Sequence, residues 1–493
     1  MLLRKLQVGH VTENRYAQLD PTWGPLDVGP IHFVGVGGAG MSVLAQMFHS
    51  LGAVVSGSDS KSSDVTRALS EAGIAVNVPQ DGAFVAQART VVLSSAIRND
   101  NPEFVAARAA GLTVIHRSQA LALLMRGRRA IAVAGAHGKT TTSAMIAVAA
   151  QHAGLDPSFA IGGSVRTETG AIAGGRVGLS DVLVAEADES DGSFLNYEPH
   201  VAVVTNIEPD HLDHYGSKEA FEQAFEQFVG QVPEDGFTVV CADDEGAFQL
   251  GLVARSQGKR VLFYGTSPVS DIAISQVSQP EGSSGISYRV KWQPTGDDFS
   301  AFGEFEGQVE LQVPGLHNAL NSAGAFASLV ALGASPEQVV EGLEAFIGTG
   351  RRFELRGTRT DIRVIDDYAH HPTEVAALLK AARVSAGAGR VVVLFQPHLF
   401  SRTRIFASEF AQALDLADQV VLTGIYAARE DNDPLVTSDL IAQHMTTSVQ
   451  VIDDRFEAAH EVARLARRGD LVLTVGAGDV TELGQVILDH LAD

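Results

Sequence analysis

The sequence contains a single cysteine, little proline and no long apolar run. Cys241 is the only cysteine among 493 residues, so no disulfide can form within the chain. Absence of disulfides suits a reducing compartment, and we expect a cytoplasmic protein. No run of about 18 apolar residues occurs, and the N-terminal residues lack the apolar centre of a signal peptide. We therefore expect no membrane insertion.

Positive charge is also scarce. The chain has 36 Lys and Arg against 59 Asp and Glu, a formal net charge of −23. Such a surface repels nucleic-acid backbones, so no nucleic-acid partner is expected. A local basic loop can still hold phosphates on an acidic protein. The 45% hydrophobic content is that of a globular protein, and its length predicts about three domains.

Short apolar runs alternate with helix-length segments from Ile31 onward, which predicts an α/β protein with parallel, doubly wound sheets. Residues 259–313 differ, because several β-like runs follow one another there, and we expect added antiparallel strands. The predicted order is an extension (1–29), a Rossmann-like domain (30–126), a central P-loop domain with parallel sheet plus added strands (127–348) and a second Rossmann-like domain (349–493).

A glycine-rich turn, GVGGAG at 35–40, lies between a predicted strand and a predicted helix. Glycines there allow a tight turn and close approach of the backbone to phosphate, while the helix N-terminus supplies N–H donors. Asp59 ends the next predicted strand. This context predicts a site for a nucleotide diphosphate, and NAD is a rival ligand for the same motif.

A second glycine loop, AGAHGKTTT at 134–142, follows the apolar run AIAVA. Its spacing is not that of a strict Walker A motif, but the chemistry is the same. Backbone N–H groups form an anion nest, Lys139 supplies a charge to terminal phosphates, and Thr140 offers a hydroxyl to Mg²⁺. The loop predicts ATP or GTP binding.

Acidic and histidine side chains follow the next strands. Glu186 ends the apolar run DVLVAEA, where a metal-holding carboxylate is needed beside a P-loop. The acids that follow it, Asp188, Glu189 and Asp191, fit a solvated loop equally well. His211 comes after VAVVTNI and could ligate a divalent metal or orient a nucleophile.

The last third of the chain carries DDYAHHPTE (366–374) and PHLFSRTR (397–404), each just past a predicted strand. One histidine together with Arg402 could hold the amine and carboxylate of a small molecule, because the guanidinium fork binds carboxylates in bidentate fashion.

Together these motifs resemble the Mur ligase family, and most of all its alanine-adding branch, from about residue 30 to the C-terminus. The matching segments are HFVGVGGAGMS (32–42), SSAI (94–97), NPE (101–103), AGAHGKTTT (134–142), AEADESD (185–191), TNIEPDHLD (205–213), HNALN (317–321), GRRFE (350–354), DDYAHHPTE (366–374) and QPH (396–398) with SRT (401–403). The resemblance implies ATP-dependent joining of L-alanine to the carboxylate of UDP-N-acetylmuramate through an acyl phosphate, in peptidoglycan precursor synthesis.

The resemblance also implies roles for individual residues. The UDP substrate would lie against Gly37, Gly38, Ala39, Gly40, Met41, Ser58, Asp59, Ser94, Ser95, His116 and Arg117. ATP would lie against Gly135, Ala136, His137, Gly138, Lys139, Thr140, Thr141, His317, Asn318, Asn321, Arg352, Asp366 and Asp367. Alanine would be held by Tyr368, His370 and Arg402, and metal by Thr140, Glu186 and His211. Lys139, His211, His370 and Arg402 would act in catalysis.

The expected cofactors are ATP and Mg²⁺, for which Mn²⁺ can substitute, and the expected assembly is a monomer or homodimer. Three alternatives stay open. One is an NAD-dependent dehydrogenase that uses residues 35–40. Another is a ligase that adds a whole peptide to the same sugar. The third is a catalytically silent UDP-sugar sensor or scaffold, against which Lys139, Thr140, Glu186 and His211 argue.

Overall fold

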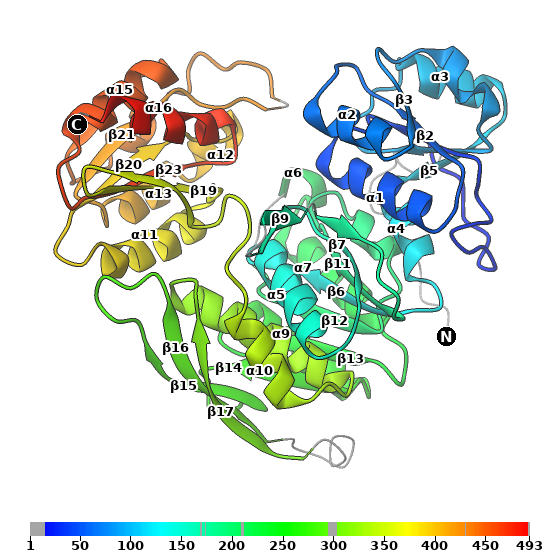
Figure 1. Ribbon diagram of the computed structural model, residues 1–493, viewed down its shortest axis with the longest axis horizontal. Coiled ribbons are helices and arrows are strands. Elements are labelled where there is room, and N and C mark those ends of the chain that lie inside the picture. Colours follow the sequence, from blue (N-terminus) through cyan, green and yellow to red (C-terminus); the bar gives the residue numbers. More distant parts are fainter. Residues whose placement is uncertain are drawn as a thin grey trace.

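The computed structural model describes residues 15–491 except 168–169, 173, 209–211, 294–302 and 429, and leaves the side chains of 212–213 undescribed. Three domains follow one another along the chain, each built around its own sheet (Figure 1). The N-terminal domain (blue) and the C-terminal domain (yellow to red) lie at opposite ends of one side of the central domain (Figure 1). Among the helices of these described residues, none has the length and apolar character needed to span a membrane.

The N-terminal domain is a five-stranded parallel sheet in the order β3-β2-β1-β4-β5. All four residues of β1 are buried, as expected for a parallel strand covered on both faces. Its elements are β1 (Ile31–Val34), α1 (Ala39–Ser50), β2 (Val55–Ser58), α2 (Asp64–Glu71), β3 (Ala75–Asn77), η1 (Gly82–Gln87), β4 (Thr90–Leu93), α3 (Pro102–Ala109), β5 (Thr113–His116) and α4 (Arg117–Met125).

The central domain has a ten-stranded sheet in the order β10-β7-β11-β6-β12-β13-β14-β15-β16-β17, plus the hairpin β8-β9. Its strands are β6 (Arg129–Ala134), β7 (Ser158–Ala160), β8 (Val165–Thr167), β9 (Gly170–Ile172), β10 (Gly175–Arg176), β11 (Val182–Glu186), β12 (Val201–Val204), β13 (Phe237–Cys241), β14 (Val261–Gly265), β15 (Ile272–Ser278), β16 (Ile286–Trp292) and β17 (Phe305–Leu311). Its helices are α5 (Lys139–His152), η2 (Ser193–Asn196), α6 (Leu212–Tyr215), α7 (Lys218–Gly230), α8 (Glu245–Ser256), α9 (Leu316–Ala331) and α10 (Pro336–Glu344).

The antiparallel strands expected within 259–313 are β15, β16 and β17, which pair antiparallel with one another. β14 differs from that expectation, because it pairs parallel with β13 and is buried along its whole length. β16 alternates between buried and less buried residues, the pattern of a sheet with one solvated face.

The C-terminal domain has a six-stranded sheet in the order β18-β19-β23-β20-β21-β22, parallel except for the edge strand β18. Its elements are β18 (Glu354–Arg359), β19 (Ile362–Asp367), α11 (Pro372–Ala386), β20 (Val391–Phe395), α12 (Phe400–Ile405), α13 (Ala407–Leu414), β21 (Gln419–Leu422), α14 (Asp439–Ala442), β22 (Val449–Val451), α15 (Arg455–Leu465), β23 (Leu471–Val475), η4 (Asp479–Glu482) and α16 (Leu483–His490). The prediction of an α/β protein with three such domains is confirmed.

The two domain junctions are built differently. One hydrophobic cluster of the described residues runs without interruption through the N-terminal and central domains. Val43 of α1 packs so closely on Gly175 of β10 that a Cβ added to this glycine would lie 2.4 Å from Val43 Cγ1. The two hydrophobic clusters of the C-terminal sheet contain buried residues of that domain only. Near α11, its described contacts with the central domain include the polar pairs His137–Glu374, Thr373–Glu208 and His371–Glu208.

Candidate active site

The P-loop connects β6 to α5 and requires glycine at two positions. Gly138 has φ 85°, and a Cβ there would lie 2.6 Å from Asn321 Oδ1. Gly135 has φ 133°, and its Cβ would lie 2.1 Å from Thr205 Oγ1. Both values exclude a side chain, so the loop stays narrow and its N–H groups stay accessible at the start of α5.

Lys139 is the first residue of α5 and its ammonium group lies over the P-loop. Nζ donates to Gly135 O at 2.6 Å and to Ala136 O at 3.1 Å, and it pairs with Glu189 at 2.9 Å. Burial would lower the pKa of Lys139, but the carboxylates of Glu189, Asp188 and Glu186 raise it above the ordinary value. Burial raises the pKa of Glu189 to about 7. The lysine is therefore cationic and held where terminal phosphates would bind.

Thr140 and Glu186 form a pair of hard oxygen ligands beside this lysine. Thr140 Oγ1 lies 3.1 Å from both carboxylate oxygens of Glu186, and Gly162 N donates to the same carboxylate at 2.9 Å. A hydroxyl and a carboxylate so placed fit Mg²⁺, which is usually bound by one or two carboxylates, waters and substrate phosphates. The other predicted metal ligand, His211, lies outside the described residues.

One cavity is lined by all three domains. It brings the start of α1 together with the P-loop, the Thr140–Glu186 pair and the segments 350–352 and 368–374 of the C-terminal domain. The lining residues are Ala39, Ala136, His137, Gly138, Lys139, Thr140, Gly162, Gly163, Ser164, Glu186, Asp188, Glu189, Ser190, Gly350, Arg351, Arg352, Tyr368, His370 and Glu374.

A neighbouring cavity collects most of the residues predicted to bind ATP. His137, Gly138, Thr141, His317, Asn318, Asn321, Arg352 and Asp367 line it, together with the apolar surfaces of Tyr264, Leu320, Phe353 and Leu378. Burial lowers the pKa of His317 to about 4, so this ring is neutral at pH 7. A largely apolar cavity edged by amide and imidazole groups suits a purine base.

Of the neighbouring residues Asp366 and Asp367, only Asp367 lines this cavity. Asp367 lines it and accepts hydrogen bonds from Phe353 N and Ala369 N at 2.7 and 2.8 Å. Asp366 is fully buried, and its carboxylate accepts from Thr474 Oγ1, Thr481 Oγ1 and Arg351 Nε inside the C-terminal domain. Asp366 is therefore absent from the residues that line the cavity.

In the N-terminal domain the glycine turn and the residues after β4 and β5 face the central domain. Asp59 Oδ2 accepts a hydrogen bond from Gly37 N at 2.9 Å, which ties the end of β2 to the turn. Ser95 Oγ lies 3.1 Å from His116 Nε2 and donates to Asp191 Oδ2 of the central domain at 2.5 Å. Burial lowers the pKa of His116 to about 4.

Of the remaining residues predicted for the UDP substrate, Arg117 lies near the three-domain cavity, whereas Ser58 and Met41 are buried. Arg117 donates to Asp188 at 2.8 Å and lies near Gly40 at the start of α1, so it stands between the N-terminal domain and the three-domain cavity. Ser58 and Met41 are buried instead, and Ser58 Oγ donates to the carboxylate of Glu103. Gly38 is the N-cap of α1, and Ser94 immediately follows β4.

Tyr368, His370 and Arg402 were predicted to hold the amino acid. Tyr368 and His370 lie edge to face at 5.2 Å and line the three-domain cavity. Arg402 is 6% exposed and reaches His398 Nδ1 at 3.5 Å, while the His398 ring is 5.6 Å from that of His370. Arg402 is therefore one side chain removed from the cavity lining.

Glu374 was not among the predicted site residues, although it ends the DDYAHHPTE motif. Its carboxylate lies 3.2 Å from His370 Nδ1, 3.3 Å from His137 Nδ1 and 3.7 Å from Arg352. Burial opposes its ionisation, but the charges of His370 and His137 hold the pKa of Glu374 well below the ordinary value. Glu374 thus connects the P-loop with the predicted amino-acid subsite.

Glu208 was also missed, and it lies on the other side of His137. His137 Nε2 is 3.1 Å from Glu208 Oε2. Burial would lower the pKa of His137, but Glu374 and Glu208 raise it to about 9. Glu208 lies in the TNIEPDHLD motif and Glu374 in the DDYAHHPTE motif, close to histidines predicted to act in catalysis. That position was the only signal in the sequence for either glutamate.

Three family models match consecutive parts of the chain: Mur ligase family, catalytic domain (30–129), Mur ligase middle domain (133–329) and Mur ligase, glutamate ligase domain (351–478). Known proteins resemble most of the chain. UDP-N-acetylmuramate--L-alanine ligase of Kineococcus radiotolerans is 50% identical, over 94% of this chain and 97% of that protein. The enzyme of the same name from Paenarthrobacter aurescens is 52% identical over the same shares. The chain belongs to the Mur ligase family.

Solved structures agree with this assignment. UDP-N-acetylmuramate-alanine ligase MurC of Thermotoga maritima is 30% identical and superimposes with a TM-score of 0.74, over 93% of this chain and 98% of that chain. A murein peptide ligase of Psychrobacter arcticus is 25% identical, with a TM-score of 0.68 over 94% and 98% of the two chains.

Proposed function

We propose that this protein joins L-alanine to the carboxylate of UDP-N-acetylmuramate with consumption of ATP, a step of peptidoglycan precursor synthesis. The observation that carries this proposal is the cavity that all three domains line. It holds the P-loop lysine, a hydroxyl–carboxylate pair and a histidine in one space, as a reaction among three substrates requires. The reaction consumes ATP, and we propose the cytoplasm as its compartment.

The reaction proceeds in two steps. The substrate carboxylate attacks the γ-phosphorus of ATP, ADP leaves, and an acyl phosphate forms. The amine of alanine then attacks the acyl carbon, loses a proton, and inorganic phosphate leaves. A carboxylate is a poor electrophile, so phosphorylation supplies the leaving group that amide formation needs.

We assign Lys139 to the terminal phosphates of ATP. Phosphate oxygens would take the place of Glu189 against its ammonium, which the P-loop carbonyls already orient. Thr140 and Glu186 would hold Mg²⁺, which when bound neutralises charge on the transferring phosphoryl group. Mn²⁺ has the same preference for oxygen ligands and would substitute.

We assign the amino acid to the space beside Tyr368 and His370. The contact of Glu374 Oε2 with His370 Nδ1 leaves Nε2 as the nitrogen available to the incoming amine. Only a deprotonated amine attacks, so His370 accepts its proton or positions it. Arg402 acts through His398 or contacts the substrate carboxylate once the domains close.

The test is release of inorganic phosphate from ATP and Mg²⁺ with UDP-N-acetylmuramate, with and without L-alanine. Release that requires both the sugar and alanine supports the proposal. Release with a peptide but not with alanine would assign the chain to a peptide-adding reaction. Absence of release with every amino acid and peptide would favour a UDP-sugar sensor, and a titration with NADH monitored by fluorescence tests the dehydrogenase alternative.

A further inference from the structure

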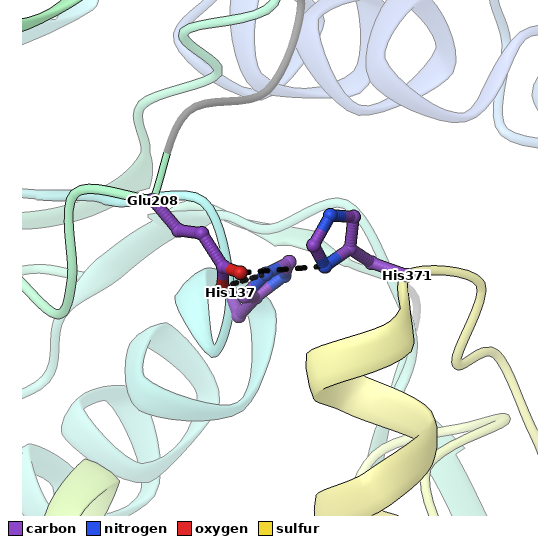
Figure 2. A group of neighbouring side chains, drawn as sticks. All are labelled: His137, Glu208 and His371. Atoms are coloured by element: carbon purple, nitrogen blue, oxygen red, sulfur yellow. Dashed lines mark hydrogen bonds and ion pairs between the residues drawn. The ribbon is translucent and has the colours of Figure 1, made fainter. Parts of the chain in front are cut away.

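Two histidines and a glutamate converge at the junction of the central and C-terminal domains, apart from the Thr140–Glu186 pair. His137 comes from the P-loop, Glu208 follows β12, and His371 directly precedes α11. One ligand atom from each lies within 4.8 Å of the other two. Figure 2 shows the three side chains pointing toward one another from the two domains.

The spacing is close to that of a metal centre. A tetrahedral zinc ion with bonds of about 2.0–2.1 Å holds its ligand atoms about 3.4 Å apart. Here His137 Nε2 lies 3.1 Å from Glu208 Oε2, and His371 Nδ1 lies 3.9 Å from Glu208 Oε1. These two distances end on different oxygens of the same carboxylate, so the Glu208 carboxyl group must rotate to present one oxygen to both histidines. The third side joins one imidazole nitrogen of each histidine. It is no longer than 4.8 Å and would shorten to about 3.4 Å when a cation binds.

Hydrogen bonds outside the group already orient two of the three side chains. His137 Nδ1 is 3.3 Å from Glu374 Oε1, so the opposite nitrogen, Nε2, faces the centre of the group. Thr373 Oγ1 donates to Glu208 Oε1 at 2.7 Å. A carboxylate on the far nitrogen of an imidazole is the usual support of a metal-ligating histidine, because it fixes the ring and makes it a stronger ligand.

The surroundings enclose the group but leave one edge open. The side chains of His371, His137 and Glu208 are 3%, 15% and 34% exposed, so a cation can enter past the glutamate. Two imidazole nitrogens and one carboxylate oxygen suit zinc-like cations, whereas Mg²⁺ prefers oxygen ligands alone. The group therefore differs in chemistry from the Thr140–Glu186 pair.

We propose that His137, Glu208 and His371 bind one divalent transition-metal cation of the Zn²⁺ type, with the fourth position left to water. The cation takes the place of the proton between His137 Nε2 and Glu208. Because two ligands belong to the central domain and one to the C-terminal domain, the bound cation links the two domains. The proposal does not rest on the ligase reaction, although His137 and Glu208 also line the cavity of the predicted ATP-binding residues.

Equilibrium dialysis of the metal-free full chain against Zn²⁺, with millimolar Mg²⁺ present to occupy the oxygen-rich site, tests the proposal. We expect His371→Gln and Glu208→Gln each to weaken Zn²⁺ binding at least about 10-fold. The control is His460→Gln, which breaks another close imidazole pair, with ring centroids of His460 and His490 4.0 Å apart. It should leave this affinity unchanged. Wild-type affinity in both ligand variants would overturn the proposal, as would failure of the wild type to retain Zn²⁺.

Cobalt provides a readout that does not depend on activity or on any variant. Co²⁺ at this site should give the strong visible absorption of a four-coordinate ion, and added Zn²⁺ should remove it. Only the weak absorption of six-coordinate Co²⁺ would overturn the assignment. Circular dichroism of each variant separates loss of a ligand from loss of the fold. Phosphate release measured in Mg²⁺ alone reports on the proposed ligase reaction separately.

Discussion

The central domain meets its two neighbours through junctions of opposite character. Toward the N-terminal domain, a continuous hydrophobic cluster crosses the boundary, and Arg117–Asp188 and Ser95–Asp191 add polar contacts at its edge. Toward the C-terminal domain, no hydrophobic cluster of the described residues crosses the boundary, and polar contacts such as that between His137 and Glu374 lie near α11. Separating two apolar surfaces in water raises the free energy, because both become exposed to water. Charged groups that separate regain hydration, which offsets part of the cost.

The difference leads us to predict which domain moves. The N-terminal domain shares one hydrophobic cluster with the central domain, so we expect the predicted UDP-sugar subsite and the P-loop to keep a constant geometry. The C-terminal domain can separate at lower cost, as a domain must when it admits and releases ATP. Tyr368 and His370 line the three-domain cavity in the arrangement described, and we expect this closed arrangement to exclude water that would hydrolyse an acyl phosphate.

The largest effect is expected at Lys139, which belongs to neither junction and so separates chemistry from domain packing. Lys139→Ala should lower kcat at least about 1,000-fold, because charge on the transferring phosphoryl group loses its cation. Phosphate release measures this loss. The variant leaves Glu189, 1% exposed, without its ammonium partner, so Lys139→Ala/Glu189→Gln is the control for stability. Ligase activity above a tenth of the wild-type value would remove Lys139 from the mechanism.

Glu374→Gln tests the polar junction. The substitution removes the negative charge that faces His137, His370 and Arg352 but keeps the size of the side chain. We expect kcat/KM for alanine to fall by about 10- to 100-fold. UDP-sugar affinity, measured by calorimetry, should change less than threefold, since the other junction is untouched. The exposed Glu409→Gln on α13 is the matched control. Equal losses for both substrates would contradict the distinction between the junctions.

Gly175→Ala tests the apolar junction. The new methyl group would lie 2.4 Å from Val43 Cγ1 and 3.2 Å from Val43 Cα, so the domains must shift. We expect a loss of about 1–3 kcal/mol in the free energy of unfolding, measured with denaturant. Gly230→Ala is the same chemical change at the end of α7, where a Cβ meets nothing within 4 Å. Equal stability of the two variants would show that this contact is not tightly packed.

The smallest effect concerns pH and His116, which lies beside the first junction. Its folded-state pKa of about 4 is below the ordinary 6.5, so the folded protein favours the neutral ring. The corresponding stability is complete above pH 6.5 and is lost as pH falls from 6.5 toward 4. At pH 5.5 the loss should be about 1 kcal/mol. His116→Gln should flatten this part of the unfolding curve, whereas the exposed His444→Gln should not; identical curves for wild type and His116→Gln would refute the assignment.

The fold and the main loops could be predicted from local sequence. Alternating apolar runs and helix-length segments indicate parallel α/β domains, and glycine loops such as GVGGAG and AGAHGKTTT carry their geometry in a few consecutive residues. The apolar periodicity of residues 404–416 predicts one continuous helix, and this prediction is wrong. The segment is divided between α12 and α13, because Phe406 leaves helical geometry (φ −111°, ψ 21°) and its ring packs on His371 at 5.0 Å.

The orientation of neighbouring residues could not be read from the motifs. Asp366 and Asp367 are consecutive in β19, and successive side chains of a strand point to opposite faces. Asp367 therefore lines the cavity of the predicted ATP-binding residues, while Asp366 turns to Thr474 and Thr481.

The sequence by itself determined the family, the three-domain order and the two glycine-rich loops. Only the tertiary structure decided that Glu374 and Glu208 flank His137 and that one junction is apolar and the other polar. Those contacts join segments far apart in the chain, and no local pattern of residues encodes which distant side chains meet.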